Sequence, residues 1–307
     1  MTTLLSDIKV SVCMITYNHA PYIEQAIESI MMQQTSFRYE LVIGEDCSKD
    51  NTREICLRMK DKYPERIHLL PETKNKGANQ NILDVYHACQ GKYIAMCEGD
   101  DYWIDDLKLQ KQSDVLDSNA DVSLVFHNVW MYHECNDTKE VFGTYDKKNY
   151  TFNDIVGKWL ISTPSVFYRK QLVFSTWYNQ VFYGDIVIFL MNAQLGKLFY
   201  LDEIMAVYRV HETSATNSLS AEANFVKLIK DYSFMLSSFK PPYRKMIRRE
   251  LGQLYYRLAR AQLKDNKRKE ARLHLVQYFK HTLSVGGRIP FSIIKIYLSL
   301  LLKPAHS

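Results

Sequence analysis

Three carboxylates lie within four residues at the end of an apolar segment. The segment GKYIAM (91–96) is rich in β-forming residues, and Glu98, Asp100 and Asp101 follow it closely. Like charges at this spacing repel one another, and their burial is costly unless a partner neutralises them. A divalent cation, which prefers hard oxygen ligands, would neutralise them and bridge a diphosphate. In the competing interpretation, Asp100 and Asp101 cap the helix predicted at 105–116, although capping needs only one aspartate.

The first hundred residues predict the elements that position these acids. Apolar strand-like segments alternate with helical periodicity, at 10–16, 40–46, 67–71 and 92–98. Short connections between such elements indicate βαβ units and a mostly parallel sheet with helices on both faces. The carboxyl ends of parallel strands meet in one crevice. The other polar residues fall at these ends: Thr16, Tyr17 and Asn18 after the first strand, Asp46 after the second, and Asn75, Lys76 and Gly77 after the third.

The pattern changes twice in the second half of the chain. From about residue 120 strand-like and helical segments are mixed, and 197–211 predicts two short strands around a turn. After a Ser/Thr-rich segment (212–222), apolar residues recur at helical spacing, and 254–279 resembles one tetratricopeptide-type hairpin that turns near Asp265 and Asn266. We therefore predict an α/β domain at 1–215 and a basic α-helical extension at 216–307.

The charge distribution is uneven between these two parts. Residues 220–307 contain 18 lysines and arginines against 5 acidic residues, a net charge of +13, whereas the remainder carries −8. A basic extension indicates an anionic partner, such as a membrane surface, or else only a solvated helix face that packs. Nucleic acid is not expected as a partner, because no recognised binding module is present.

Several other classes of protein are disfavoured. The six cysteines are scattered without a C-x-x-C pair, which is typical of reduced, cytoplasmic proteins rather than of a disulfide frame or a zinc site. The N-terminus lacks the basic start and apolar core of a signal peptide. Walker A, G-x-G-x-x-G and G-x-S-x-G motifs are absent, which argues against P-loop NTPases, NAD enzymes and α/β-hydrolases.

Four segments in succession resemble the signatures of family 2 glycosyltransferases: SVCMITYNHAPYIEQAIESI, ELVIGEDCSKDNT, NKGANQN and GKYIAMCEGDDYW. The resemblance covers roughly residues 8–215. It implies the GT-A fold, a Rossmann-like mostly parallel sheet flanked by helices. It also implies a nucleoside-diphosphate sugar donor, with UDP-sugars ranked first, and inversion at the anomeric carbon.

The resemblance also implies roles for individual residues. Thr16, Tyr17 and Asn18 match the first nucleotide-contacting loop, and Asp46 matches the aspartate that accepts a hydrogen bond from the base. Lys76 falls in a loop near the ribose and diphosphate. Asp100 is expected near the ribose and the metal, and Asp101 as the firmest ligand of Mn²⁺ or Mg²⁺. Glu98 stands where many members have aspartate.

The second half supplies the remaining expected site residues. Inversion needs a base that takes the proton from the acceptor hydroxyl, and Asp185, at the start of a predicted helix, matches the family's base; a helix cap is the alternative. YRVHETS matches a late R-x-H element, with His211 as a third metal ligand and Arg209 as a diphosphate clamp. Tyr102 and Trp103 are either a sugar-stacking wall or core, and the segment STPS (162–165) is a candidate acceptor contact.

These observations predict a metal-dependent inverting glycosyltransferase. Its acceptor would be a saccharide or a polyprenyl-diphosphate-linked glycan, and the enzyme would be cytoplasmic, at the inner face of the membrane if the C-terminal helices bind it. A sugar-nucleotide nucleotidyltransferase would share the sheet and the acids but needs a glycine-rich loop after the first strand, where this chain has TYNHAPY. A non-catalytic nucleotide-sugar-binding or scaffold protein is the third interpretation; it would not turn over any donor.

Overall fold

The computed structural model describes residues 8–212 and 219–302. They group into two compact units, one formed by residues 8–174 and 188–212, the other by 175–187 and 219–302. The expected boundary at 215/216 stays a prediction. One contact explains why 175–187 groups with the later helices: the Asp231 carboxylate accepts hydrogen bonds from the N–H groups of Phe182 and Tyr183.

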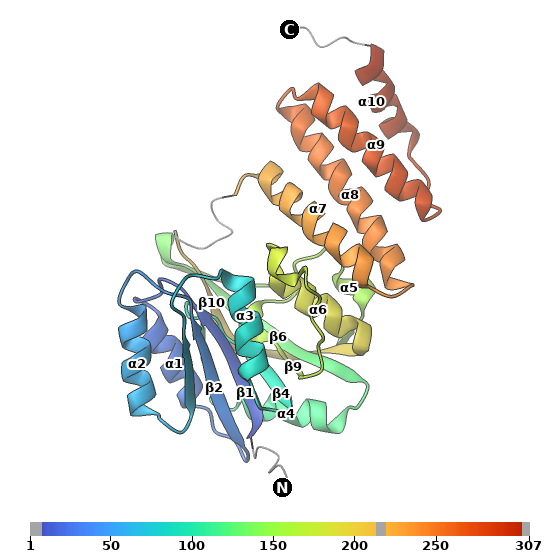
Figure 1. Cartoon of the computed structure of the whole chain (residues 1–307). Helices are drawn as coiled ribbons and strands as arrows, with labels where there is room; N and C mark the ends of the chain where they lie inside the picture. Colours follow the sequence, from blue (N-terminus) through green and yellow to red (C-terminus); the bar gives the residue numbers. More distant parts are fainter. Residues whose placement is uncertain (1–7, 213–218, 303–307) are drawn as a thin grey trace. The chain divides into compact units, whose positions relative to one another are not determined.

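The first part of the chain alternates strands and helices, as the periodicity predicts (Figure 1). The elements are β1 (Ile8–Thr16), α1 (Ile23–Met31), β2 (Arg38–Glu45), α2 (Thr52–Lys62), β3 (Ile67–Pro71), α3 (Ala78–Ala88) and β4 (Tyr93–Met96). Strands β3, β2, β1 and β4 lie side by side in that order and are all parallel. The chain moves from β1 to β2 to β3 toward one edge of the sheet, and it then crosses back to place β4 on the other side of β1. Because crossover connections are right-handed, α1 and α2 cover one face of the sheet and α3 covers the other.

The middle of the chain extends the same sheet with shorter strands in both directions. The elements are β5 (Tyr102–Trp103), α4 (Lys108–Ser118), β6 (Val122–His133), η1 (Glu134–Asn136), β7 (Thr138–Val141), β8 (Asn149–Tyr150), α5 (Phe152–Ile155), η2 (Thr163–Ser165), β9 (Phe167–Arg169), η3 (Tyr178–Gln180), α6 (Gly184–Leu195) and β10 (Lys197–Val210). In the described residues these strands join β1–β4 in one ten-stranded mixed sheet. The expectation of an α/β sheet flanked by helices is confirmed.

Strand β10 corrects one expectation. The segment 197–211 was expected to form two short strands around a turn, but Lys197–Val210 is one strand parallel to β6. The polar pair Asp202 and Glu203 lies in a register shift between Leu201 and Ile204. A bulge of this kind absorbs extra residues without reversing the chain, so the strand continues to Arg209 at the edge where the acids lie.

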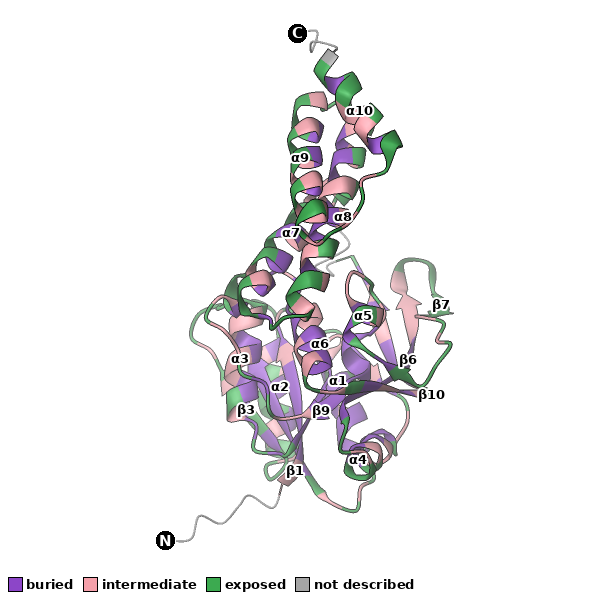
Figure 2. Cartoon of the chain, turned by 90° about the vertical axis from the view of Figure 1, so that its right-hand side faces the viewer, coloured by how far each residue is buried: buried purple, intermediate pink, exposed green. Residues whose placement is uncertain are grey.

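The core lies between the sheet and its helices. Side chains from β1 and β2, from α1 and α2, and from α4 form one buried cluster, which places α4 on the same face as α1 and α2. Figure 2 shows the central strands buried along much of their length. The sheet is therefore a rigid platform, and the loops at its carboxyl edge are positioned by it.

The second unit contains four longer helices: α7 (Ala221–Ser238), α8 (Tyr243–Lys264), α9 (Arg268–Ser284) and α10 (Phe291–Leu302). The expected hairpin is confirmed, because α8 and α9 meet at Asp265 and Asn266, where Asn266 takes a φ of 57°. None of the described helices combines the length and the apolar character that crossing a bilayer requires.

Candidate active site

The carboxyl ends of β1, β2, β3 and β4 carry the polar residues that the sequence singled out. Thr16 ends β1, Asp46 follows β2, Lys76 follows β3, and Asp100 follows β4. The carboxyl end of β10 adds Arg209 and His211. Residues from five strands are thus brought to one edge of the first unit. Asp185 belongs to the second unit.

The acidic loop after β4 holds its carboxylates close together. Glu98, Asp100 and Asp101 each place a carboxylate oxygen within 4.8 Å of the others. Asp101 is 1% exposed; its Oδ1 accepts a hydrogen bond from the Arg209 N–H at 2.9 Å. Burial, followed by the charges of Asp100 and Glu98, raises the pKa of Asp101 well above its usual value. The free loop is therefore electrostatically strained, as the sequence suggested.

Two oxygens of this loop are buried and have no hydrogen-bond partner among the described residues. They are Oδ1 of Asp100 and Oδ2 of Asp101. Buried polar atoms are nearly always paired in folded proteins, so unpaired carboxylate oxygens indicate a place for a ligand. Oxygen atoms of this kind suit Mg²⁺ or Mn²⁺. The residues present therefore fit the divalent cation that the sequence resemblance implies.

Gly99 lets the acidic loop approach β1 closely. A Cβ atom added at Gly99 would lie 2.5 Å from Oγ1 of Thr16 and 3.0 Å from Nδ1 of His19. Contacts below 3 Å are not tolerated, so a side chain here would push the acids away from the β1 loop. Oγ1 of Thr16 and Nδ1 of His19 are also buried without a partner among the described residues. The unpaired atoms thus come from the carboxyl end of β1 and its loop, and from the loop after β4.

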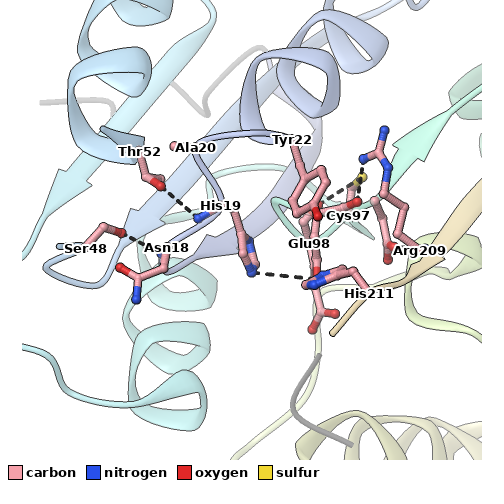
Figure 3. A network of polar contacts seen from close by, with 12 residues as sticks. Asn18, His19, Ala20, Tyr22, Ser48, Thr52, Cys97, Glu98, Arg209 and His211 are labelled. Carbon is pink, nitrogen blue, oxygen red and sulfur yellow. Dashed lines mark hydrogen bonds and ion pairs between the residues drawn. The ribbon is translucent and has the colours of Figure 1, made fainter. Parts of the chain in front are cut away.

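Two imidazoles flank the carboxylate of Asp100. Nε2 of His211 lies 3.1 Å from Oδ2 of Asp100, and Nε2 of His19 lies 3.7 Å from the same oxygen. Burial lowers the pKa of His19, which favours the neutral imidazole that ligates metals. Burial alone would raise the pKa of Asp100, but the hydrogen bond with His211 and the electrostatic interaction with His19 lower it below its usual value. Figure 3 shows both imidazoles beside the loop that begins at Cys97 and Glu98.

Arg209 is held by the protein itself. Its guanidinium donates to the backbone oxygen of Asp100 at 2.6 Å and to the side chain of Gln25. It also lies over the rings of Tyr22 and Tyr102, at 5.0 and 4.5 Å from their centroids. These contacts orient the acidic loop. The expected role of Arg209 as a diphosphate clamp stays a prediction.

Sequence reasoning missed His19, Tyr22 and Glu134. The Tyr22 hydroxyl donates to Glu134 at 2.7 Å, and its ring centroid lies 4.9 Å from that of His211. Burial and Glu134 raise the pKa of Tyr22 to about 12. His19 and Tyr22 lie in the matched segment SVCMITYNHAPYIEQAIESI, shortly after TYN, and this was a usable signal. Glu134 lies beyond β6, and its arrival beside Tyr22 depends on the sheet topology.

Asp46 links the loops at the carboxyl ends of β1, β2 and β3. Its carboxylate accepts hydrogen bonds from the N–H groups of Lys76 at 2.7 Å and Gly77 at 2.8 Å. Its own N–H donates to the carbonyl of Thr16, and the Asn75 amide donates to its carbonyl. A carboxylate has about four lone-pair sites, so Asp46 can also accept from a base. Its expected contact with the base stays a prediction.

The other expected donor residues are partly engaged with neighbours. Asn18 is exposed, takes a φ of 56°, and is linked through hydrogen bonds to Ser48 and Lys49 in the loop after β2. The Lys76 ammonium forms ion pairs with Glu72 at 2.6 Å and Asp84 at 2.8 Å. The donor roles of Thr16, Tyr17, Asn18 and Lys76 stay predictions.

Asp185 lies in the first turn of α6, not at its cap. The helix begins at Gly184, and the N–H groups of Phe182 and Tyr183, just before it, donate to Asp231 of α7 at 2.8–3.0 Å. Asp231, which the sequence did not single out, therefore satisfies the backbone N–H groups just before the helix. A carboxylate at a helix N-terminus is stabilised by the helix dipole. The role of Asp185 as the base stays a prediction.

Trp103 and Lys108 are core residues behind the acidic loop. Trp103 is 1% exposed, and its indole N–H donates to the carbonyl of Pro164 at 3.1 Å. Lys108 is fully buried; its Nζ lies 4.1 Å from the centroid of the Trp103 ring and donates to Oε1 of Gln112 at 2.7 Å. Gln112 in turn donates to the carbonyl of Ser165. The core interpretation of Trp103 therefore holds, and this network fixes the segment 163–165.

Lys108 makes the stability of the protein depend on pH. Burial lowers the pKa of Lys108 to about 7, so between that pH and about 10.4 the unfolded chain holds a proton that the folded chain has released. Burial of the charged amine lowers the free energy of unfolding by its full amount below the folded pKa of about 7. This destabilisation disappears as the pH rises toward about 10.4, the pKa in the unfolded chain. We expect Lys108→Met to gain stability relative to the wild type at pH 7, and this gain to shrink by roughly 3–5 kcal/mol by pH 10.

Urea unfolding at pH 7, 8.5 and 10 measures this difference. Lys111→Met is the matched control on the same helix, because Lys111 is partly exposed and pairs with Asp105 and Glu203. Its effect should be small and nearly independent of pH. A Lys108→Met difference that does not change over this range would contradict the assignment of a buried, mostly neutral amine.

Comparison with known proteins gives a consistent family and fold. The model of the family described as Glycosyl transferase family 2 matches residues 11–173. An uncharacterized protein of Mycobacterium tuberculosis is 33% identical over 202 residues, covering 66% of this chain and 58% of the relative. A GalNAc(5)-diNAcBac-PP-undecaprenol β-1,3-glucosyltransferase of Campylobacter jejuni is 25% identical, covering 73% and 72%.

Solved structures share the fold at low sequence identity. The Staphylococcus aureus protein TarS (1–349), in complex with UDP-GlcNAc, aligns with a TM-score of 0.63 and 16% identity over 95% of this chain and 84% of that one. A Pyrobaculum calidifontis mannosyltransferase in complex with GDP-Man and Mn²⁺ gives 0.58 and 15%, over 96% and 81%. These likenesses agree with the expected GT-A fold. With more than half of its length matched by the family model, the chain belongs to glycosyl transferase family 2.

Proposed function

We propose that this protein is an inverting glycosyltransferase that transfers a sugar from a nucleoside-diphosphate sugar to an acceptor hydroxyl. One observation carries the proposal. Buried polar atoms without a partner among the described residues gather at the carboxyl ends of β1 and β4, namely Oγ1 of Thr16, Nδ1 of His19, Oδ1 of Asp100 and Oδ2 of Asp101. A polar ligand that supplies both charge and hydrogen bonds would satisfy them, and a diphosphate with a divalent cation would supply both.

The nucleoside binds on the β1–β2–β3 side of this edge. Asp46 accepts a hydrogen bond from the base with its remaining lone pairs, and Thr16, Tyr17, Asn18 and Lys76 contact the nucleotide. The existing hydrogen bonds from Lys76 and Gly77 to Asp46 support this assignment, because they hold the carboxylate in one orientation before the donor arrives. We rank UDP-sugars first among donors.

Asp101 and Asp100, with His211 as the third ligand, would hold a divalent cation, Mn²⁺ or Mg²⁺. When bound, the cation would neutralise charge that develops on the departing diphosphate. Arg209 keeps the loop in place through the backbone of Asp100 and through Asp101. The loop is thus preorganised by contacts that do not involve the donor.

The acceptor hydroxyl loses its proton to Asp185 and attacks the anomeric carbon in line with the leaving diphosphate. The new glycosidic bond forms as the bond to the diphosphate oxygen breaks, which inverts the configuration. The acceptor is a saccharide or a polyprenyl-diphosphate-linked glycan; the Campylobacter relative, named for an undecaprenol-linked acceptor, supports the lipid-linked class.

A donor screen tests this function. UDP-, GDP- and dTDP-sugars are added with and without Mn²⁺, and the melting temperature of the protein is measured, because a ligand that binds only the folded state raises it. We expect a UDP-sugar to raise it in a Mn²⁺-dependent way and to release nucleoside diphosphate when a saccharide or lipid-linked acceptor is added. Absence of both effects with all three donor classes would overturn the proposal.

A further inference from the structure

Helix α10 carries apolar side chains on two sides. One side packs inward: Ile293 and Leu300 are buried in a cluster with Ala271, Leu275 and Tyr278. Lys295 is the single charged residue in the helix, Phe291–Leu302. A helix that is apolar nearly all round is normally buried or in contact with lipid.

The other side of α10 is exposed. Phe291 is 77% exposed, and Leu298 and Leu301 are each 48% exposed. Spacings of seven and ten residues place these three side chains on one side of a helix, away from Ile293 and Leu300. Figure 2 shows exposed residues on α10 along its length. Within the described residues, nothing covers this stripe, which we call the α10 stripe (Phe291, Leu298 and Leu301).

Basic residues lie near the α10 stripe in the sequence. Arg288 and Lys295 are exposed, and no aspartate or glutamate follows Glu270 in the sequence, whereas five lysines and arginines do. Helix α9 also exposes apolar side chains in this basic part of the chain: Leu273, Val276 and Leu283. Exposed leucine or phenylalanine among cations is the composition of helices that lie at the surface of anionic membranes.

We propose that α10 docks in the plane of an anionic lipid bilayer, with the α10 stripe in the boundary between headgroups and acyl chains. Arg288 and Lys295 face the headgroup phosphates. Twelve residues of helix are about 18 Å long, too short to cross a hydrocarbon core of about 30 Å, so the helix lies on the membrane. The proposed lipid contact uses none of the residues assigned to the donor.

The charges select this partner over two others. A second copy docked symmetrically through its own α10 stripe would bring the same cations together, with no acid after Glu270 to pair with them. A nucleic acid would be held through its phosphates, which leaves the exposed Phe291 and Leu298 without a role. An anionic bilayer matches both the cations and the apolar side chains.

Co-sedimentation with vesicles tests the proposal on the whole chain. We expect binding to vesicles of phosphatidylcholine with about one-third phosphatidylglycerol, weak binding to phosphatidylcholine alone, and a loss of binding at high salt. The combined substitution Phe291→Ser, Leu298→Ser and Leu301→Ser should weaken binding about tenfold or more, because the apolar area that enters the interface is removed.

A matched control variant tests whether vesicle binding requires the α10 stripe in particular or any exposed apolar surface. Leu57→Ser, Val173→Ser and Leu195→Ser remove three other exposed apolar side chains, and we expect wild-type vesicle binding. Unchanged binding of the α10 variant, or no binding of the wild type to anionic vesicles, would overturn the proposal. A concentration-dependent dimer in light scattering that the α10 variant abolishes would assign the stripe to self-association instead. Nucleotide-dependent melting reports separately on the proposed function, so the two can fail independently.

Discussion

Asp101→Asn is expected to abolish the Mn²⁺-dependent part of nucleoside-diphosphate binding while making the ligand-free protein more stable. Asp101 is almost completely buried, and Asp100 and Glu98 lie beside it. An amide of the same shape keeps the hydrogen bond from Arg209 but removes the carboxylate that would ligate a cation. We expect the metal-dependent gain in affinity to fall by about 100-fold or more.

The opposite effect on stability makes this prediction specific. Without a cation, a buried carboxylate among like charges is unfavourable, so its neutral replacement should raise the free energy of unfolding by about 1–3 kcal/mol. Calorimetric titration of UDP with and without Mn²⁺, and urea unfolding of the free protein, measure the two effects. Asp61→Asn, at an exposed position of α2, is the control and should change neither. Equal affinity of Asp101→Asn and wild type in Mn²⁺ would remove Asp101 from the metal site.

Asp185→Asn is expected to remove sugar transfer and leave donor binding nearly intact. A general base typically contributes a factor of about 10²–10⁴ to the rate, and an amide cannot accept the acceptor proton. The fold should tolerate the change, because Asp231 pairs with the N–H groups that precede α6. Single-turnover transfer and thermal shift with the UDP-sugar separate the chemical step from binding.

Two further variants show whether the effect of Asp185 is chemical. Asp265→Asn, on an exposed residue between α8 and α9, should behave as the wild type. Asp231→Asn should lower the melting temperature, because a buried cap of two backbone N–H groups is weakened. Should Asp185→Asn lose stability and donor binding along with transfer, as a cap would, Asp185 is structural and the base must be sought elsewhere.

The parallel part of the fold was predictable from local patterns. Strand-like segments of five to seven residues, separated by helices with clear periodicity, indicate βαβ units. The position of polar residues directly after those runs then follows from the shared edge of parallel strands. Thr16, Asp46 and Asp101 could be placed at one edge for this reason. The acid cluster was also recognisable in the sequence, because three carboxylates in four residues have few structural explanations.

The parts that depend on long-range pairing were not predictable. Strand β9 inserts between β4 and β6 in antiparallel orientation, and no local signal specifies that position. The bulge at Asp202 and Glu203 resembles a turn in sequence. The contacts of Arg209 with Gln25, and of Asp231 with Tyr183, join residues far apart in the chain. Such partners are known only once the topology is known.

For the donor contact proposed for Asp46, its hydrogen bonds have a consequence for engineering donor preference. Asp46 follows β2 and connects the ends of two other strands. Its N–H donates to the carbonyl of Thr16 at the end of β1, and its carboxylate accepts hydrogen bonds from the loop after β3. A library that varies Asp46 to recruit another base would loosen all three loops at once, and losses of folding would hide any gain in selectivity. Retargeting the donor should therefore keep Asp46 fixed and vary the exposed neighbours, Asn18 and Lys49, whose mutual hydrogen bond closes the outer side of the same region.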